Sequence, residues 1–181
     1  MFYDELNYSI NSGASDNIYI LNRWQEFLCE EASYSLENFS EDDWKKLYQE
    51  LPKKSIIWLR RLAECLNKFE DENQLKLFSY LSYIDDVPLF TILLCQILAY
   101  DLEDVKKYID QTSNPDYIYE KAEKYKPLAD KFYLVNYELI LGLKEKAIIT
   151  MWIPFRRYHK KDSNKKEKII FLFLYKFFSF S

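Results

Sequence analysis

The stretch SYLSYIDDVPLFTILLCQILAYDLEDV, residues 79–105, indicates how this chain folds. Its two apolar segments are interrupted by Asp85 and Asp86, and Pro88 follows shortly after them. An aspartate caps a helix well because its carboxylate accepts hydrogen bonds from the first backbone N–H groups, and a proline in the first turn removes no intrahelical hydrogen bond. We therefore expect one helix to end before these aspartates and an apolar helix to begin at them, as the chain turns back.

Similar helix starts recur along the chain. Capping residues occur near positions 40, 54, 71, 86 and 101, and Ser40 with Asp43 forms a pattern typical of a capping box. The starts are about 15 residues apart, so two consecutive helices span about 30 residues, a period typical of helical repeats. The pattern predicts an all-α fold of antiparallel helix pairs stacked into a short α-solenoid. An irregular helical bundle is the alternative, because short turns allow both arrangements.

The composition also favours helices. The 181 residues fit one domain, and only two of them are glycine, which leaves little material for hairpin turns. Residues 1–15 are polar and rich in tyrosine, and we expect them to form a lead-in segment before the helices. From Asp16, a plausible N-cap, the pattern becomes helical, and one apolar face is expected to contain Ile20, Leu21, Trp24, Phe27 and Leu28.

The net charge of −4 combines two segments of opposite sign. Residues 1–143 carry 26 acidic and 15 basic residues, whereas residues 144–181 carry 3 acidic and 10 basic residues. We interpret residues 1–143 as the helical-repeat domain and residues 144–181 as a basic and apolar C-terminal extension, and the sequence leaves open whether the extension packs on the body. An acidic body disfavours binding to nucleic acid phosphates and favours a basic protein partner.

No group of residues in the sequence is typical of an active site. The chain has one histidine, His159, and it lacks the motifs HExxH, CxxC, DxDxDG, GxxxxGK[ST] and GxGxxG. Cys29, Cys65 and Cys95 are widely spaced, and we expect them to be buried hydrophobic residues in a reducing cytoplasm. The apolar run at residues 169–180 is too short to span a membrane. We therefore expect no catalytic, cofactor-binding or metal-binding residue.

The region 55–111 carries a resemblance to a known family. Trp58, Arg61, Leu62 and Leu66 precede an acidic turn, and the sequence DDVP then precedes an apolar helix. This arrangement resembles a HEAT-like helical repeat. A small acidic protein of this kind looks like the immunity proteins of bacterial contact-dependent growth inhibition and related polymorphic toxin systems.

The resemblance implies a stoichiometric inhibitor that binds the C-terminal domain of a cognate toxin. Many such toxins are basic nucleases, so an acidic surface on the inhibitor can occupy the place of the nucleic acid. We therefore expect an immunity protein that acts in the cytoplasm through protein–protein binding and has no enzymatic activity. One alternative is a helical-repeat adaptor or scaffold that binds a host protein. Another is a binder of nucleic acid or membrane surfaces that acts through residues 156–168.

The predicted partner-binding residues come from the sequence pattern itself and not from the resemblance. If successive helices alternate in direction, the acidic turns at residues 70–72 and 101–104 lie at one edge, and residues 41–43 could join them. Carboxylates at one edge focus a negative potential, and exposed tyrosines nearby can serve as anchors. The predicted contacts are Glu70, Asp71, Glu72, Asp101, Glu103 and Asp104, with the anchors Tyr80, Tyr83, Tyr117 and Tyr119. We expect no direct contact with nucleic acid or membrane, and the oligomeric state stays open.

Overall fold

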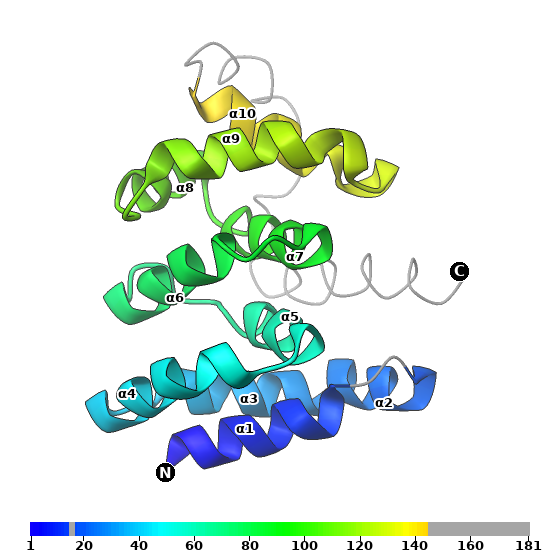
Figure 1. Ribbon diagram of the computed structural model, residues 1–181, viewed down its shortest axis with the longest axis vertical. Helices are drawn as coiled ribbons and strands as arrows, with labels where there is room; N and C mark the ends of the chain where they lie inside the picture. Colours follow the sequence, from blue (N-terminus) through cyan, green and yellow to red (C-terminus); the bar gives the residue numbers. More distant parts are fainter. Residues whose placement is uncertain (15–16, 145–181) are drawn as a thin grey trace, which may run out of the picture. The chain divides into compact units, whose positions relative to one another are not determined.

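The computed structural model describes residues 1–14 and 17–144, and within these ranges the chain is all-α, with no β-strand (Figure 1). The chain divides into two compact units, Met1–Leu141 and Gly142–Ser181, and the description below concerns the first. Apart from Lys144, the predicted extension 144–181 lies outside the described residues. The helices are α1 (Phe2–Gly13), α2 (Ile18–Arg23), α3 (Cys29–Glu37), α4 (Glu41–Glu50), α5 (Ile56–Glu64), α6 (Glu72–Ser82), α7 (Val87–Ile97), α8 (Leu102–Asp110), α9 (Pro115–Tyr125) and α10 (Leu134–Lys144).

The predicted helix starts are confirmed. At the start of α4, the Ser40 hydroxyl accepts a hydrogen bond from the Asp43 N–H at 3.3 Å, and the Asp43 carboxylate accepts one from the Ser40 N–H at 3.1 Å. At the start of α7, Asp86 accepts from the Leu89 N–H at 2.7 Å, and Pro88 lies in the first turn. The N-caps of α4 to α9 are Ser40, Ser55, Asp71, Asp86, Asp101 and Asn114.

The helices are arranged as successive packed layers. In Figure 1, α1, α3 and α4 lie at one end of the unit, followed by α5, then by α6 with α7, and then by α8 with α9. The apolar helix α7 packs against both α5 and α6 and buries its side chains almost all round. Each fully buried aliphatic side chain contributes about 1.5–3 kcal/mol relative to an exposed one, so α7 is a principal source of stability. Its fully buried residues are Leu89, Phe90, Leu93, Leu94 and Ile97.

The prediction that residues 1–15 form a lead-in was wrong, because residues 2–13 form the helix α1. Tyr3, Leu6 and Ile10 lie on one face of this helix and are buried. Their spacing is helical, but the polar residues between them conceal the pattern. The Tyr3 N–H donates to the Asp43 carboxylate at 3.0 Å, which links α1 to the start of α4.

The next helical segment contains a π turn that the sequence did not predict. Asn17 caps α2, and the predicted cap Asp16 lies outside the described residues. The π turn η1 (Trp24–Leu28) follows, and the Cys29 N–H donates to the Trp24 carbonyl, five residues back. A π turn accommodates one additional residue, which rotates the following side chains around the helix axis. Trp24 and Leu28 therefore stay buried, whereas Phe27 is 61% exposed, contrary to the prediction of a shared face.

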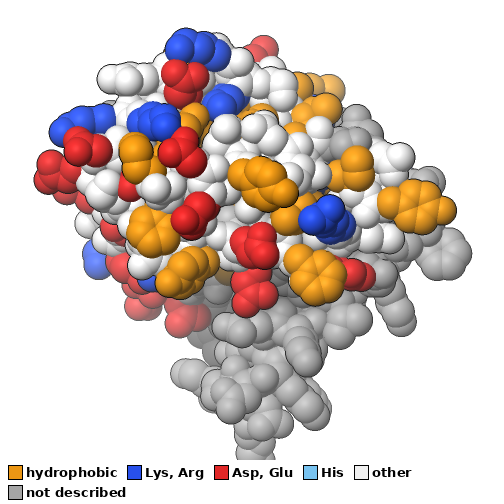
Figure 2. Space-filling model, turned by 90° about the horizontal axis from the view of Figure 1, so that it is seen from below, with side chains coloured by type: hydrophobic (Ala, Val, Ile, Leu, Met, Phe, Trp, Pro, Cys, Tyr) orange, Lys and Arg blue, Asp and Glu red, His pale blue; other side chains and the backbone are white. Residues whose placement is uncertain are grey.

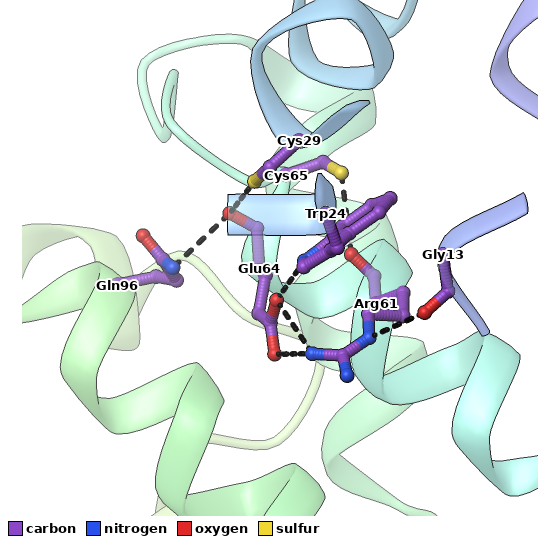
Figure 3. A network of polar contacts seen from close by, with 7 residues as sticks. All are labelled: Gly13, Trp24, Cys29, Arg61, Glu64, Cys65 and Gln96. Atoms are coloured by element: carbon purple, nitrogen blue, oxygen red, sulfur yellow. Dashed lines mark hydrogen bonds and ion pairs between the residues drawn. The ribbon is translucent and has the colours of Figure 1, made fainter. Parts of the chain in front are cut away.

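A partly buried polar network joins this N-terminal layer to the rest of the stack (Figure 3). The Trp24 indole N–H donates to the Glu64 carboxylate of α5, which also accepts from the Arg61 guanidinium at 2.9 Å. Arg61 Nε donates in turn to the Gly13 carbonyl at 3.2 Å, and Gln96 of α7 donates to the Glu64 backbone carbonyl at 3.1 Å. Burial raises the pKa of Glu64, and the charge of Arg61 opposes this effect. The network fixes α1 and the π turn on α5 and α7.

Candidate protein-binding surface

The two acidic turns predicted to share an edge lie against one another. Between them lies Tyr100, whose hydroxyl donates to the Asn67 carbonyl and is 3.4 Å from a carboxylate oxygen of Glu70. The Tyr100 ring also packs edge-on against Phe69, with ring centroids 5.7 Å apart. Burial, followed by the negative charges of Asp104 and Glu70, raises the pKa of Tyr108, as expected if both turns flank this tyrosine. We call residues 70–72 together with 101–104 the acidic edge.

The carboxylates of the acidic edge differ in how strongly they are already engaged. Asp71 caps α6 by accepting hydrogen bonds from two backbone N–H groups at 2.9 and 3.0 Å. Glu72 forms an ion pair with Lys76 at 2.7 Å, which lowers the pKa of Glu72. Asp101 is the exposed N-cap residue of α8. Glu70 and Glu103 are exposed and have no ion pair within the described part of the chain, so these two are the most available to a cationic partner.

Residues 41–43 do not extend the acidic edge as a cluster of surface carboxylates. Asp43 is buried, at 2% exposure, where it caps α4 and accepts from the Tyr3 N–H. Its hydrogen bonds outweigh the effect of burial and lower the pKa of this carboxyl group. Asp42 is exposed but forms an ion pair with Lys45 at 3.0 Å. The acids at this helix start therefore serve mainly to cap and stabilise α4.

Three of the four predicted tyrosine anchors lie close together, Tyr80 in α6, Tyr83 at its C-cap and Tyr117 in α9. Tyr80 and Tyr83 are 38% and 45% exposed, and the Tyr83 ring stacks on that of Tyr117 with the centroids 4.5 Å apart. Tyr48 of α4 joins this group, because its ring packs edge-on against Tyr80 at 6.3 Å. Tyr119 is only 4% exposed, so its assignment as a surface anchor was wrong. Its neighbour Ile118 is buried as well, since this side of α9 faces the core.

Tyr48, Tyr80 and Tyr83 line an open groove of about 440 Å³, which we call the tyrosine groove. Its walls come from α4, α6 and the turn between α8 and α9, and they include Tyr48, Tyr80, Tyr83, Glu72 and Lys76. Burial raises the pKa of Tyr48 to about 12, so its hydroxyl stays protonated at neutral pH. Glu72 belongs both to the groove and to the acidic edge, so the two features are continuous.

A buried lysine links α9 to the C-terminal end of α6, next to the tyrosine groove. Lys121 of α9 is 4% exposed, and its ammonium group donates to the backbone carbonyls of Ser82 and Ile84, both at 2.5 Å. The same group lies 5.0 to 5.7 Å from the ring centroids of Phe90, Tyr117 and Tyr125. Burial lowers the pKa of Lys121 to about 8. Because it binds the carbonyl end of α6, Lys121 fixes the positions of Tyr83 and Tyr117 relative to one another.

A second exposed aromatic surface was missed by the sequence analysis. It lies on the outer side of α1 and α3, where Figure 2 shows hydrophobic side chains interspersed with acidic ones. Tyr8, Phe27 and Tyr34 are 67%, 61% and 62% exposed, more than any tyrosine of the groove. The available signal was the helical spacing of Phe27 and Tyr34 with Glu30 and Glu31 between them. The spacing alone does not tell whether such a stripe is covered by a neighbouring helix.

The described residues provide no arrangement typical of metal or cofactor chemistry. Within residues 1–14 and 17–144, no three histidine, cysteine, aspartate or glutamate side chains gather as metal ligands would. His159 and the basic run 156–168 lie outside these ranges. Among the helices described, none combines the length and apolar character required to cross a membrane. The described surface that the sequence predicted combines the partly exposed Tyr80 and Tyr83 with the carboxylates of the acidic edge.

No protein-family model, no curated protein and no solved structure matches this chain.

Proposed function

We propose that this chain is an immunity-type inhibitor that binds a basic toxin domain, with the tyrosine groove and the acidic edge as its binding surface. The observation that carries the proposal is that the groove opens beside Glu72, on the acidic edge that also presents Glu70 and Glu103. Aromatic side chains supply contact area at low cost in conformational entropy, and carboxylates around them select a cationic surface. The resemblance to toxin-immunity proteins supplies the class of partner.

The proposed mechanism has two steps. Carboxylates that have no ion pair attract a cationic domain over a distance of about 10 Å at moderate ionic strength, which accelerates encounter. Tyr80, Tyr83 and Tyr117 then become covered, and desolvation of such aromatic anchors holds the complex together. Inhibition follows when the bound surface overlaps the site at which the toxin binds its substrate. The proposed mechanism assigns no role to a cofactor, and it includes action in the cytoplasm as part of the same proposal.

The first test is purification of the tagged full-length chain from its native bacterium at low and at high salt. The proposal expects one basic protein domain in near-equal amount at low salt and less of it at high salt. A spread of host proteins would instead favour the adaptor alternative. Nucleic acid that copurifies with the full chain, but not with a variant lacking residues 156–168, would favour the hypothesis of a nucleic-acid binder.

The second test uses charge reversal once that domain is identified. The double variant Glu70→Lys with Glu103→Lys is expected to slow association about ten-fold without changing the far-UV circular dichroism. A control of equal net charge is Glu123→Lys with Glu138→Lys, at two exposed positions on α9 and α10. Equal slowing by both double variants would show that only the overall charge matters, and it would remove the acidic edge from the proposal.

A further inference from the structure

The outer side of the N-terminal helix pair presents aromatic and acidic side chains that no described element covers. We call this surface the terminal face and define it by Glu5, Tyr8, Phe27, Glu30, Glu31 and Tyr34. All six side chains are exposed, and those from residue 27 to 34 follow a helical spacing that places them on one stripe. Figure 2 views this end of the molecule directly and shows the two side-chain types intermixed.

The two helices bring their stripes side by side. They run antiparallel, because the Phe2 ring packs against Tyr34 at 6.4 Å at one end and Gly13 abuts Trp24 at the other. The opposite side of the pair contacts α4 and α5, and it carries the buried residues Leu6 and Leu36. The terminal face is therefore a two-helix surface, and the bonds of Arg61 to Gly13 and of Glu64 to Trp24, shown in Figure 3, link it to α5.

The charge of this surface is strongly one-sided. Residues 1–39 contain seven acidic residues and one basic residue, Arg23. Asp4 and Glu37 are neutralised by Lys46 and Lys68, at 2.7 and 2.6 Å. The carboxylates of Glu5, Glu30 and Glu31 form no ion pair with any residue in the described ranges. Each is therefore available to a cation from outside the described part of the chain.

The side chains of the terminal face differ from those on the outer face of a typical terminal layer in a stacked helical protein. Terminal layers of stacked helical proteins carry a polar outer face, because a face exposed to water gains nothing from large apolar side chains. Here three exposed aromatic rings lie among unpaired carboxylates, so a partner that covers the rings has to bring cationic groups to the carboxylates. A second copy of the same face is a poor occupant, because its carboxylates would repel those of the first.

We propose that the terminal face is a second docking surface, which takes a cationic protein surface that carries apolar side chains between its lysines or arginines. The surface is separate from the tyrosine groove, which α4, α6 and the α8–α9 turn form. This proposal therefore does not depend on the immunity function, and it makes the chain able to contact a partner through two faces.

The test is a titration of the full-length chain, labelled with ¹⁵N, with a synthetic helical peptide composed of lysine and leucine. Two matched peptides serve as comparisons, one with glutamate in place of lysine and one with serine in place of leucine. We expect shifts of the amide signals of α1, η1 and α3, weaker at high salt, and only with the lysine–leucine peptide. Shifts confined to other helices, or equal binding of the glutamate peptide, would overturn the proposal.

Variants separate the roles of the anchors and the charges. Phe27→Ser with Tyr34→Ser, and separately Glu30→Gln with Glu31→Gln, are each expected to raise the Kd of the lysine–leucine peptide at least about ten-fold. The control Glu120→Gln with Glu123→Gln, at two exposed positions of α9 outside both surfaces, is expected to change it less than about two-fold. An equal loss of peptide affinity in all three double variants would show that binding is not specific to the terminal face. If sedimentation shows a dimer, and the double variant Phe27→Ser with Tyr34→Ser abolishes it, the occupant of the terminal face is a second copy of the chain and not the proposed cationic partner.

Discussion

At the scale of single residues, Gly13 sets the distance between α1 and the π turn. A Cβ atom at this position would lie 2.2 Å from Trp24 Cε3, and the indole of Trp24 is fully buried and held by Glu64. Neither ring nor backbone can move away without breaking the network that includes the Gly13 carbonyl and Arg61. Glycine is therefore required here for space, since a side chain of any size meets the indole ring.

Gly13→Ala is accordingly expected to lower the free energy of unfolding by about 1–3 kcal/mol, the usual cost of overpacking. Without the clash, alanine in a helix would be favoured by about 1 kcal/mol, so the sign of the effect is informative. Urea unfolding measures it. Asn11→Ala, at an exposed position of the same helix, is the control and should be neutral or stabilising. A stabilised Gly13→Ala variant would show that the indole can shift.

The buried Lys121 predicts a dependence of stability on alkaline pH. Its pKa is about 8 in the folded chain and near 10.5 when unfolded, so the unfolded state binds more protons between these values and stability rises with pH. Relative to Lys121→Met, the wild type should gain on the order of 2 kcal/mol between about pH 7.5 and about pH 10. Urea unfolding across this range measures the gain.

The exposed Lys124, three residues further along α9, provides the matched control for this experiment. Lys124→Met is expected to follow the wild-type pH profile in the alkaline range. A wild type and a Lys121→Met variant with parallel profiles would contradict the assignment of Lys121 as a titrating buried group.

At the scale of elements, one carboxylate at the start of α7, that of Asp86, has two roles. Asp86 caps the helix and also binds Arg60 of α5 through two hydrogen bonds, at 2.7 and 3.0 Å. Burial alone would raise the pKa of Asp86, but the bonds from Arg60 and the Leu89 N–H outweigh it and lower the pKa. The cap therefore also ties α7 to α5, which the sequence pattern of Asp85, Asp86 and Pro88 did not predict.

Asp86→Ala is expected to cost about 2 kcal/mol, and Asp86→Asn roughly half as much, because asparagine still caps the helix. Asp71→Ala removes an N-cap from α6 and serves as the comparison, with an expected cost of about 1 kcal/mol. Because the pKa of Asp86 is lowered on folding, its contribution is present above about pH 4 and is lost as the pH falls further. The advantage of the wild type over Asp86→Asn should shrink in the same range, and a constant difference would contradict this account.

The elements could largely be predicted from the sequence because their starts carry local signals. Capping residues such as Ser40 and Asp86 act on backbone groups within a few positions, so short-range reasoning detects them. The helix at residues 2–13 was missed because polar residues dilute its buried stripe. The exposed position of Phe27 could not be predicted, since it depends on a π turn that packing around Trp24 stabilises.

At the scale of the whole molecule, layered helices predict that distant changes act independently. Gly13 contacts the α1 end of the unit through Trp24 and Arg61, whereas Lys121 contacts α6, α7 and α9. In stacked folds stability is a sum over layers and their neighbours. The changes in unfolding free energy of Gly13→Ala and Lys121→Met should therefore add within about 0.5 kcal/mol in the double variant. A coupling above about 1 kcal/mol would indicate one undivided core.

The candidate site was only partly predictable at this scale. Periodicity alone brought together the acidic turns, because alternating helices return to the same edge every second turn. It could not tell that Tyr119 faces the core while Tyr83 stays exposed, since this depends on how α9 is rotated against its neighbours. The terminal face could not be predicted for a related reason. The spacing of Phe27, Glu30 and Tyr34 places them on one stripe, but it does not show whether another helix covers that stripe.

The enclosure of Lys121 also makes this side chain a reporter of slow opening. An amine-reactive reagent modifies exposed lysines at once, but it reaches Lys121 only when α9 separates from the end of α6. If closing is faster than modification, the labelling rate at this one position follows the population of the opened state. Mass spectrometry of timed samples would thus measure how often α9 separates from the end of α6 in the unaltered protein. A partner that covers Tyr83 and Tyr117 should lower the labelling rate of Lys121.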